Sequence, residues 1–174
     1  MFVLMIVAIV SATTLPQVLV GRDRARAIAA AKYLAQQCGI ARFQAVGKGR
    51  YVALRFTPAG GDHVAEMFID GNRNGVRTTD ITAGIDMPLR TGTALSSDYP
   101  GTRIAIDPSL GLGLDPIRLG GGMLLSFSPS GTATAGTVYV LGRDGTQLAV
   151  RVLGATARTR VLRYERTTSS WEQP

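Results

Sequence analysis

The sequence predicts an α+β protein, in which one long N-terminal helix, half apolar and half amphipathic, packs on an antiparallel β-sheet head. Two observations carry this prediction. No charged side chain occurs in residues 1–21, and helical periodicity continues to about residue 47. From Tyr51 onward, apolar residues recur at every second position in short runs separated by glycine-rich turns, a pattern typical of antiparallel strands.

The uncharged segment, residues 1–21, is long enough to cross a membrane. At 1.5 Å per residue it forms a helix of about 30 Å, roughly the thickness of a bilayer core. We expect a kink at Pro16, because the proline ring removes an amide donor and crowds the preceding turn. The sequence therefore predicts that residues 1–21 are the transmembrane half of the helix and that the protein is a single-pass membrane protein.

Residues 22–47 are expected to form the amphipathic half of the helix, which ends at Gly47. Its apolar side chains are small, so the surface that covers them must approach closely. Cys38 is the single cysteine, which excludes an internal disulfide, and we expect it on the buried face. The predicted buried stripe consists of Ile28, Ala31, Leu34, Ala35, Cys38, Ala41 and Ala45.

Residues 48–166 are expected to form one β-rich globular head, and residues 167–174 a flexible tail. In the first strand, Val52, Leu54 and Phe56 are predicted to point inward, with Ala53 outward and the strand ending at residues 57–61. Residues 143–146 are predicted to form a hairpin turn. The predicted strands cover residues 51–56, 64–69, 87–90, 103–106, 123–127, 137–141, 147–153 and 158–164.

The composition indicates a basic, non-catalytic protein. The formal net charge is +7, and the basic excess lies in residues 22–55 and 129–174. His63 is the single histidine, and no nucleophile lies near it in the sequence. We find no catalytic set in the sequence, so neither an enzyme nor a cofactor is expected.

Residues 70–75 offer a candidate metal site. Asp70, Asn72 and Asn74 place oxygen donors at alternate positions with glycine at the sixth, as at the start of an EF-hand loop. The twelfth position is Ile81 instead of a glutamate, however. Asx side chains that accept hydrogen bonds from their own backbone build the same turn without an ion. The alternatives are therefore a structural turn, which the residues favour, and a calcium site.

Several motifs occur together along the chain in a definite order. An apolar N-terminal helix precedes residues 34–45 (LAQQCGIARFQA), a helix end followed by a basic turn and a strand. Residues 68–75 (FIDGNRNG), residues 126–131 (SFSPSG) and residues 157–160 (ARTR) follow. In this order and spacing the motifs resemble the GspH/FimT family of minor pseudopilins, which are type IV pilin-like subunits.

The resemblance implies a non-enzymatic structural subunit of a type II secretion pseudopilus or of a type IV pilus tip. It also implies a bacterial inner-membrane anchor, with the head in the periplasm or on the extracellular pilus tip. Its partners would be other major and minor pseudopilins or pilins. Family members carry a basic leader and an acidic residue before the position of Met1, so we expect a true start upstream, with prepilin peptidase as a further partner.

Arg158 and Arg160 are candidate nucleic-acid contacts. On a strand they point to one face about 6.6 Å apart, close to the spacing of successive phosphates. Some family members take up DNA through a similar basic strand, so the resemblance implies backbone contacts without base specificity. A solvated or subunit-facing basic edge is the favoured alternative. Arg143, Arg151, Arg163 and Arg166 lie in the same region, with Arg163 expected to point the other way.

A third hypothesis is an exported soluble β protein with a cleaved signal peptide. Residues 10–12 would then be a signal-peptidase site and Thr13 the mature start. The helical pattern that continues beyond Pro16 counts against this alternative.

Overall fold

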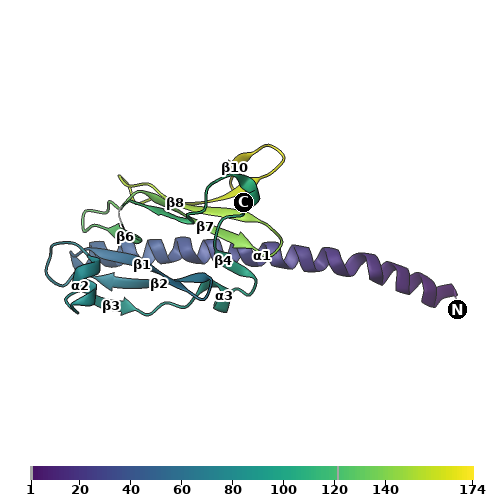
Figure 1. Ribbon diagram of the computed structural model, residues 1–174, viewed down its shortest axis with the longest axis horizontal. Helices are drawn as coiled ribbons and strands as arrows, with labels where there is room; N and C mark the ends of the chain where they lie inside the picture. Colours follow the sequence, from purple (N-terminus) through teal and green to yellow (C-terminus); the bar gives the residue numbers. More distant parts are fainter. Residues whose placement is uncertain (1, 121) are drawn as a thin grey trace.

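The computed structural model describes residues 2–120 and 122–174, with side chains from residue 21 onward. Helix α1 (Phe2–Lys48) runs through the head between two antiparallel sheets, so the fold is α+β, as predicted (Figure 1). The structure does not describe the side chains of residues 1–20. The predictions made for Thr13, for a kink at Pro16 and for most of the membrane anchor therefore fall outside the described residues. In the part of the chain that the structure describes, no helix combines the length and apolar character needed to cross a bilayer.

One sheet has four strands in the order β3-β2-β1-β6. Strands β1 and β2 form a hairpin whose two turn residues, Gly60 and Gly61, have φ angles of 56° and 82°. Two successive positive φ angles are typical of the tight turn that matches strand twist, and glycine adopts them without strain. The strands are β1 (Val52–Ala59), β2 (Asp62–Ile69), β3 (Met87–Arg90) and β6 (Leu124–Phe127).

The second sheet has six strands. Its order is β10-β9-β8-β7-β4, and β5 also pairs with β7. Three short helical segments lie in the connections of the head: α2 (Thr78–Thr82), α3 (Leu95–Asp98) and η1 (Pro108–Leu110). The strands are β4 (Thr102–Ile104), β5 (Ile117–Leu119), β7 (Gly136–Gly142), β8 (Gln147–Val152), β9 (Thr159–Glu165) and β10 (Ser170–Glu172).

The main core lies where the two sheets enclose α1. As predicted, small side chains on the helix let the sheet approach closely, and an ideal Cβ on Gly142 would lie 2.9 Å from the Cβ of Ala27. Ile28 and Ala35 of the predicted stripe are only partly buried, whereas Ala27, Ala30 and Gln37 are additional buried positions. The remaining predicted positions on the helix are buried: Ala31, Leu34, Cys38, Ala41 and Ala45.

Several local predictions were wrong. Strand β1 continues through residues 57–59, which were expected to end it, because the turn lies at Gly60 and Gly61. Ala53 is buried, since it packs with Phe68 and Val76 in a small second core on the outer face of the four-stranded sheet. The predicted head is one sheet, but the structure has two.

Residues 167–174, predicted to form a flexible tail, contain strand β10 instead. Trp171 anchors this strand: its ring centroid lies 5.8 Å from that of Tyr139 and 5.2 Å from that of Tyr164. These aromatic contacts cover apolar surface that β9 and β7 present away from α1. Partial burial of this large aromatic ring offsets the entropy of ordering the last residues.

Candidate functional site

The candidate nucleic-acid residues Arg158 and Arg160 are both exposed. Arg160 lies in β9, next to Val161, which packs against the main core. Side chains alternate along a strand, so Arg160 points away from α1. Arg158 precedes β9, and its carbonyl accepts a hydrogen bond of 3.0 Å from the backbone amide of Leu153, which extends the ladder by one step. The two arginines therefore occupy the outer surface of the six-stranded sheet.

Two further arginines lie in register with this pair. Arg151 of β8 is directly opposite Arg160. Thr137 of β7 is opposite Arg151, and Arg118 of β5 is opposite Thr137. Arg118 donates a hydrogen bond to the carbonyl of Leu112 and lies 5.1 Å from the ring centroid of Tyr139. We name Arg118, Arg151, Arg158 and Arg160 the arginine row.

The arginine row is electrostatically unbalanced. Among the described residues, none of its four guanidinium groups forms an ion pair. Like charges directly opposite on neighbouring strands, as Arg151 and Arg160 are, destabilise a sheet. Bound anions or an acidic partner surface would relieve this repulsion. Guanidinium groups bind phosphate and carboxylate oxygens in a bidentate manner, so the row is chemically suited to either.

The other C-terminal arginines do not belong to the row. Arg163 is opposite Leu148, a core residue, so it points toward α1 as predicted. Its Nη2 lies 3.4 Å from a Glu165 oxygen. Arg166 forms an ion pair with Asp107 and donates a hydrogen bond of 3.2 Å to the carbonyl of Gly145. Sequence reasoning grouped these residues with Arg151 and missed Arg118, because only strand pairing brings β5 beside β7.

The candidate metal loop is organised around the buried carboxylate of Asp70. Oδ1 accepts backbone hydrogen bonds from Asn72 at 3.1 Å and Arg73 at 2.7 Å. Oδ2 accepts one from the amide of Gly75 at 2.8 Å. Gly71 must be glycine here, because a Cβ would lie 2.0 Å from the carbonyl oxygen of Ile85. These contacts are those of the Asx-turn alternative, in which the backbone itself satisfies the carboxylate.

Two acidic residues that follow this loop complete it. The buried carboxylate of Asp86 accepts hydrogen bonds from the amides of Gly71 and Arg77, both at 2.9 Å. Asn74 and Asn72 donate side-chain hydrogen bonds to Asp80, and these bonds lower the pKa of its carboxyl. Among the described residues no group of three or more His, Cys, Asp or Glu side chains could hold a metal ion. Calcium binding at Asp70, Asn72 and Asn74 stays the less favoured alternative to a structural turn.

The single histidine and the single cysteine lie on different elements, β2 and α1. His63 is opposite Pro58 in the β1–β2 hairpin. Cys38 is buried in the main core, and burial raises the pKa of its thiol to about 12. A neutral thiol is a poor nucleophile and a poor metal ligand, so Cys38 acts as a small core residue.

A long N-terminal helix packed on two antiparallel sheets, with an Asx loop around the buried Asp70 carboxylate and a basic outer face, is an α+β architecture consistent with a pilin-like fold. The family model of the type II transport protein GspH matches residues 30–157, more than half of the chain. The chain therefore belongs to the GspH family, which confirms the resemblance to minor pseudopilins. The matched residues include the Asp70 loop and end one residue before Arg158. A comparison with curated proteins and one with solved structures each found no match.

Proposed function

We propose that this protein is a minor pseudopilin, a structural subunit of a type II secretion pseudopilus or of a type IV pilus tip. Family membership implies a structural role in type II secretion, and one observation supports assembly. Helix α1 buries one face in its own head and leaves another uncovered, on which Phe43 and Val46 are 75% and 52% exposed. Uncovered apolar side chains on a long helix are typical of a surface that a partner covers.

In this proposal, residues 1–21 anchor the chain in the bacterial inner membrane with a single pass. The head then lies in the periplasm or on the extracellular pilus tip. The uncovered face of α1 packs against the helices of other pseudopilins. Lys32, Gln36 and Gly39 lie on the same exposed side as Phe43, and no atom lies within 4 Å of a Cβ built on Gly39. A partner helix can therefore approach closely at this point.

The test is the variant Phe43→Glu in the native cell. Because Phe43 is exposed, its replacement leaves the head folded but removes an apolar contact from the proposed interface. Burying a phenylalanine contributes roughly 1.5–3 kcal/mol, so recovery with the other pseudopilins should fall by about tenfold or more. Leu114→Glu is the matched control, since Leu114 is 84% exposed on a loop of the head. Equal recovery of both variants with the pseudopilins would contradict the proposal.

The arginine row supports a second candidate function, in which the subunit binds the phosphate backbone of DNA. Four arginines without an ion pair among the described residues lie on β5, on β8, on β9 and just before β9, so the surface suits a polyanion better than a single phosphate. Arg158 and Arg160 would be backbone contacts, and Arg151 and Arg118 would extend the contact across the sheet. Binding of this kind weakens steeply as salt rises.

DNA binding is tested by titrating duplex DNA at several salt concentrations. In the double variant Arg158→Ala with Arg160→Ala, the affinity for DNA should fall. The slope of log affinity against log salt concentration should also become shallower by about 0.9 for each lost phosphate contact. Lys48→Ala with Arg77→Ala removes the same charge from exposed residues outside the row and should leave the slope unchanged. If the two double variants bind DNA equally well, the arginine row does not bind DNA and instead faces a partner subunit or solvent.

A further inference from the structure

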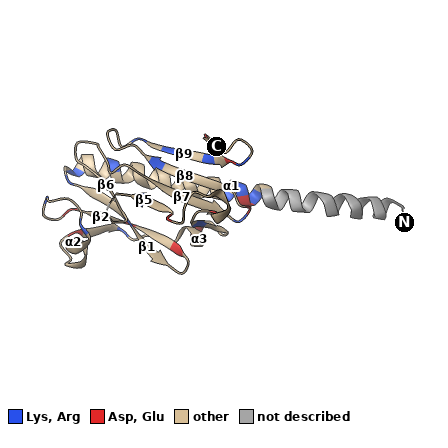
Figure 2. Ribbon diagram, turned by 45° about the horizontal axis from the view of Figure 1, so that its top comes forward, with Lys and Arg blue, Asp and Glu red and all other residues tan. Residues whose placement is uncertain are grey.

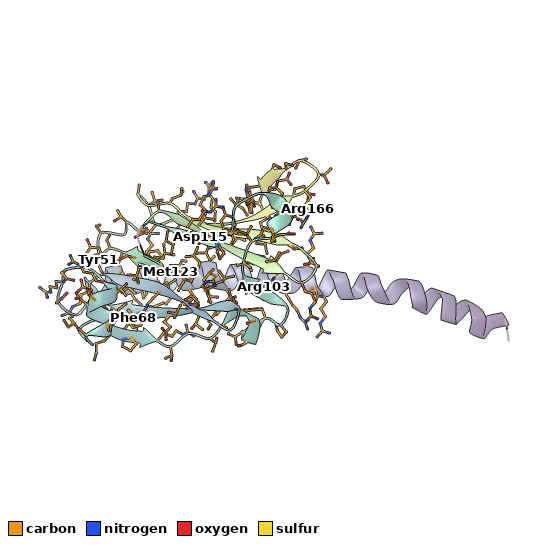
Figure 3. The ribbon with its side chains drawn as sticks, viewed as in Figure 1. Tyr51, Phe68, Arg103, Asp115, Met123 and Arg166 are labelled. Atoms are coloured by element: carbon orange, nitrogen blue, oxygen red, sulfur yellow. The ribbon has the colours of Figure 1, made fainter. Side chains whose placement is uncertain are left out.

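A small basic hollow lies where α1 emerges from the head. Its volume is about 180 Å³, and it is lined by α1, the β7–β8 turn and the end of β9. Figure 2 shows basic residues on α1 beside the end of β9, and Figure 3 shows Arg166 at this end of the head with Tyr51 at the opposite end. The lining residues are Arg24, Asp144, Gly145, Thr146, Arg163, Tyr164, Glu165 and Arg166.

The carboxylates at this hollow already have partners. Asp144 accepts hydrogen bonds from the amide of Thr146 at 3.2 Å and from its hydroxyl at 2.6 Å. Glu165 pairs with Arg163 and accepts a hydrogen bond of 3.3 Å from the Thr167 hydroxyl. Asp107, just outside, pairs with Arg166. Three arginines and two carboxylates line the hollow, so its lining carries a net charge of +1, and Arg24 is the lining cation that no described carboxylate pairs with.

Two guanidinium groups retain unused hydrogen-bonding capacity. Arg24 is exposed and, among the described residues, forms neither an ion pair nor a side-chain hydrogen bond. Arg163 makes one long contact, 3.4 Å to Glu165, and its Nε is buried without a hydrogen-bond partner. A guanidinium group has five N–H donors, so a small rotation of Arg163 would offer an anion in the hollow several of them.

The position of the hollow identifies the source of the anion. Arg24 lies three residues after the uncharged segment 1–21, which corresponds to about 4.5 Å along a helix. If that segment spans the bilayer, as the proposed function states, the hollow lies at the depth of the lipid headgroups. Tyr164, an aromatic residue with a polar tip, lines it, as is typical of a membrane–water boundary.

We propose that this hollow binds the phosphate of an anionic phospholipid in the leaflet that faces the head. Arg24 and Arg163 bind the phosphate oxygens, and Arg166, held by Asp107, adds positive charge at the rim. A bound lipid sets the height and rotation of the head relative to the bilayer. It also compensates Arg24, which lies on the head side against the positive-inside bias, whereas the nearby Arg26 is paired with Asp23.

The test uses the full chain in nanodiscs of phosphatidylcholine with a minor fraction of phosphatidylglycerol. Native mass spectrometry counts the phosphatidylglycerol molecules that stay bound to the released protein. The test variants are Arg24→Gln, at an exposed position where folding is unaffected, and Arg24→Gln with Arg163→Gln. The matched control is Lys48→Gln with Arg77→Gln, because both residues are exposed and Lys48, the last residue of α1, lies about 36 Å from Arg24 along the helix.

Wild type and control should retain phosphatidylglycerol in preference to phosphatidylcholine. Each arginine removed should reduce this preference about fivefold, the effect of one basic residue near an anionic membrane. Equal retention by wild type and Arg24→Gln would overturn the lipid site. Inorganic phosphate that displaces the lipid at equal concentration would also overturn it, in favour of a site for free phosphate. Failure of the chain to insert into any nanodisc would contradict the proposed anchor instead, so the two failures are distinguishable.

Discussion

The Asp62 carboxylate, at the start of β2, accepts a hydrogen bond of 2.8 Å from the backbone amide of Ile104 on β4, and this bond joins the two sheets. The same carboxylate accepts hydrogen bonds from the amides of His63 at 2.8 Å and Ser96 at 2.9 Å. Asp62 is 5% exposed. One buried side chain therefore links the two sheets beside α1.

Replacing Asp62 by alanine should destabilise the protein strongly. The change leaves the amides of His63, Ser96 and Ile104 without their acceptor, and one unsatisfied buried group costs about 1–3 kcal/mol. We expect a loss of roughly 3 kcal/mol or more in the free energy of unfolding, measured by urea denaturation. Asp98→Ala, at an exposed position, is the control and should cost less than about 1 kcal/mol. Equal losses in both variants would show that the inter-sheet bond contributes little.

Gly142→Ala should loosen the contact between α1 and the six-stranded sheet. The new Cβ would lie 2.9 Å from Ala27 and 2.7 Å from the Asp144 carboxylate, so the helix or the turn must shift. Overpacking of this kind costs typically about 1–3 kcal/mol. Gly39→Ala is the matched control, because nothing lies within 4 Å of its Cβ. Alanine at this helical position should stabilise the protein by about 0.5–1 kcal/mol. If the midpoint of thermal unfolding shifts in the same direction in both variants, this account of the packing between α1 and the sheet is contradicted.

The Asp70 loop should hold its shape without an ion. Asp70→Ala removes the acceptor of three backbone hydrogen bonds and should lower the midpoint of thermal unfolding. The wild-type midpoint should be the same in a chelator and in millimolar calcium, as the Asx-turn alternative predicts. If calcium raises the midpoint of thermal unfolding of the wild type, and raises it less in the double variant Asn72→Ala with Asn74→Ala, the calcium alternative is established instead.

Asp107 should make stability depend on acid pH. Hydrogen bonds from Ser109, and then the Arg166 guanidinium, hold the pKa of this carboxyl at about 2, below its ordinary value of 3.8. The lower pKa in the folded state means that the stabilisation is complete above about pH 4 and is lost as pH falls toward 2. In Asp107→Asn, the difference in unfolding free energy from wild type should therefore shrink between pH 5 and pH 2. A difference that stays constant over this range would exclude the contribution of Asp107.

Much of the secondary structure could be predicted because its signals are local. Strand β3 was placed at residues 87–90 as observed, and most other predicted strands differ from the structure by a few residues at an end. The predicted inward-facing residues of β1, Val52, Leu54 and Phe56, are all in the core. Alternation and helical periodicity reflect which side of an element is buried, so a single chain segment carries them.

The candidate sites were predictable only in part. Arg158 and Arg160 could be placed on one face from their spacing. Arg118 could not be added to them, because β5 and β9 reach the same surface only through β7 and β8. Likewise, the residues that follow Asp70 in the sequence predict a turn. Asp86, whose carboxylate completes that turn, is distant in the chain and could not be assigned to it.

The sequence by itself determined the order of elements, a helix with one narrow buried stripe and a glycine-rich β head, because each depends on residues close together in the chain. Only the tertiary structure decided that the head is two sheets joined by Asp62 and Ile104. It also decided that residues 170–172 form a strand, since Trp171 is partly covered only when Tyr139 and Tyr164 lie beside it. Contacts between distant residues depend on how the elements pack, and no local pattern encodes that packing.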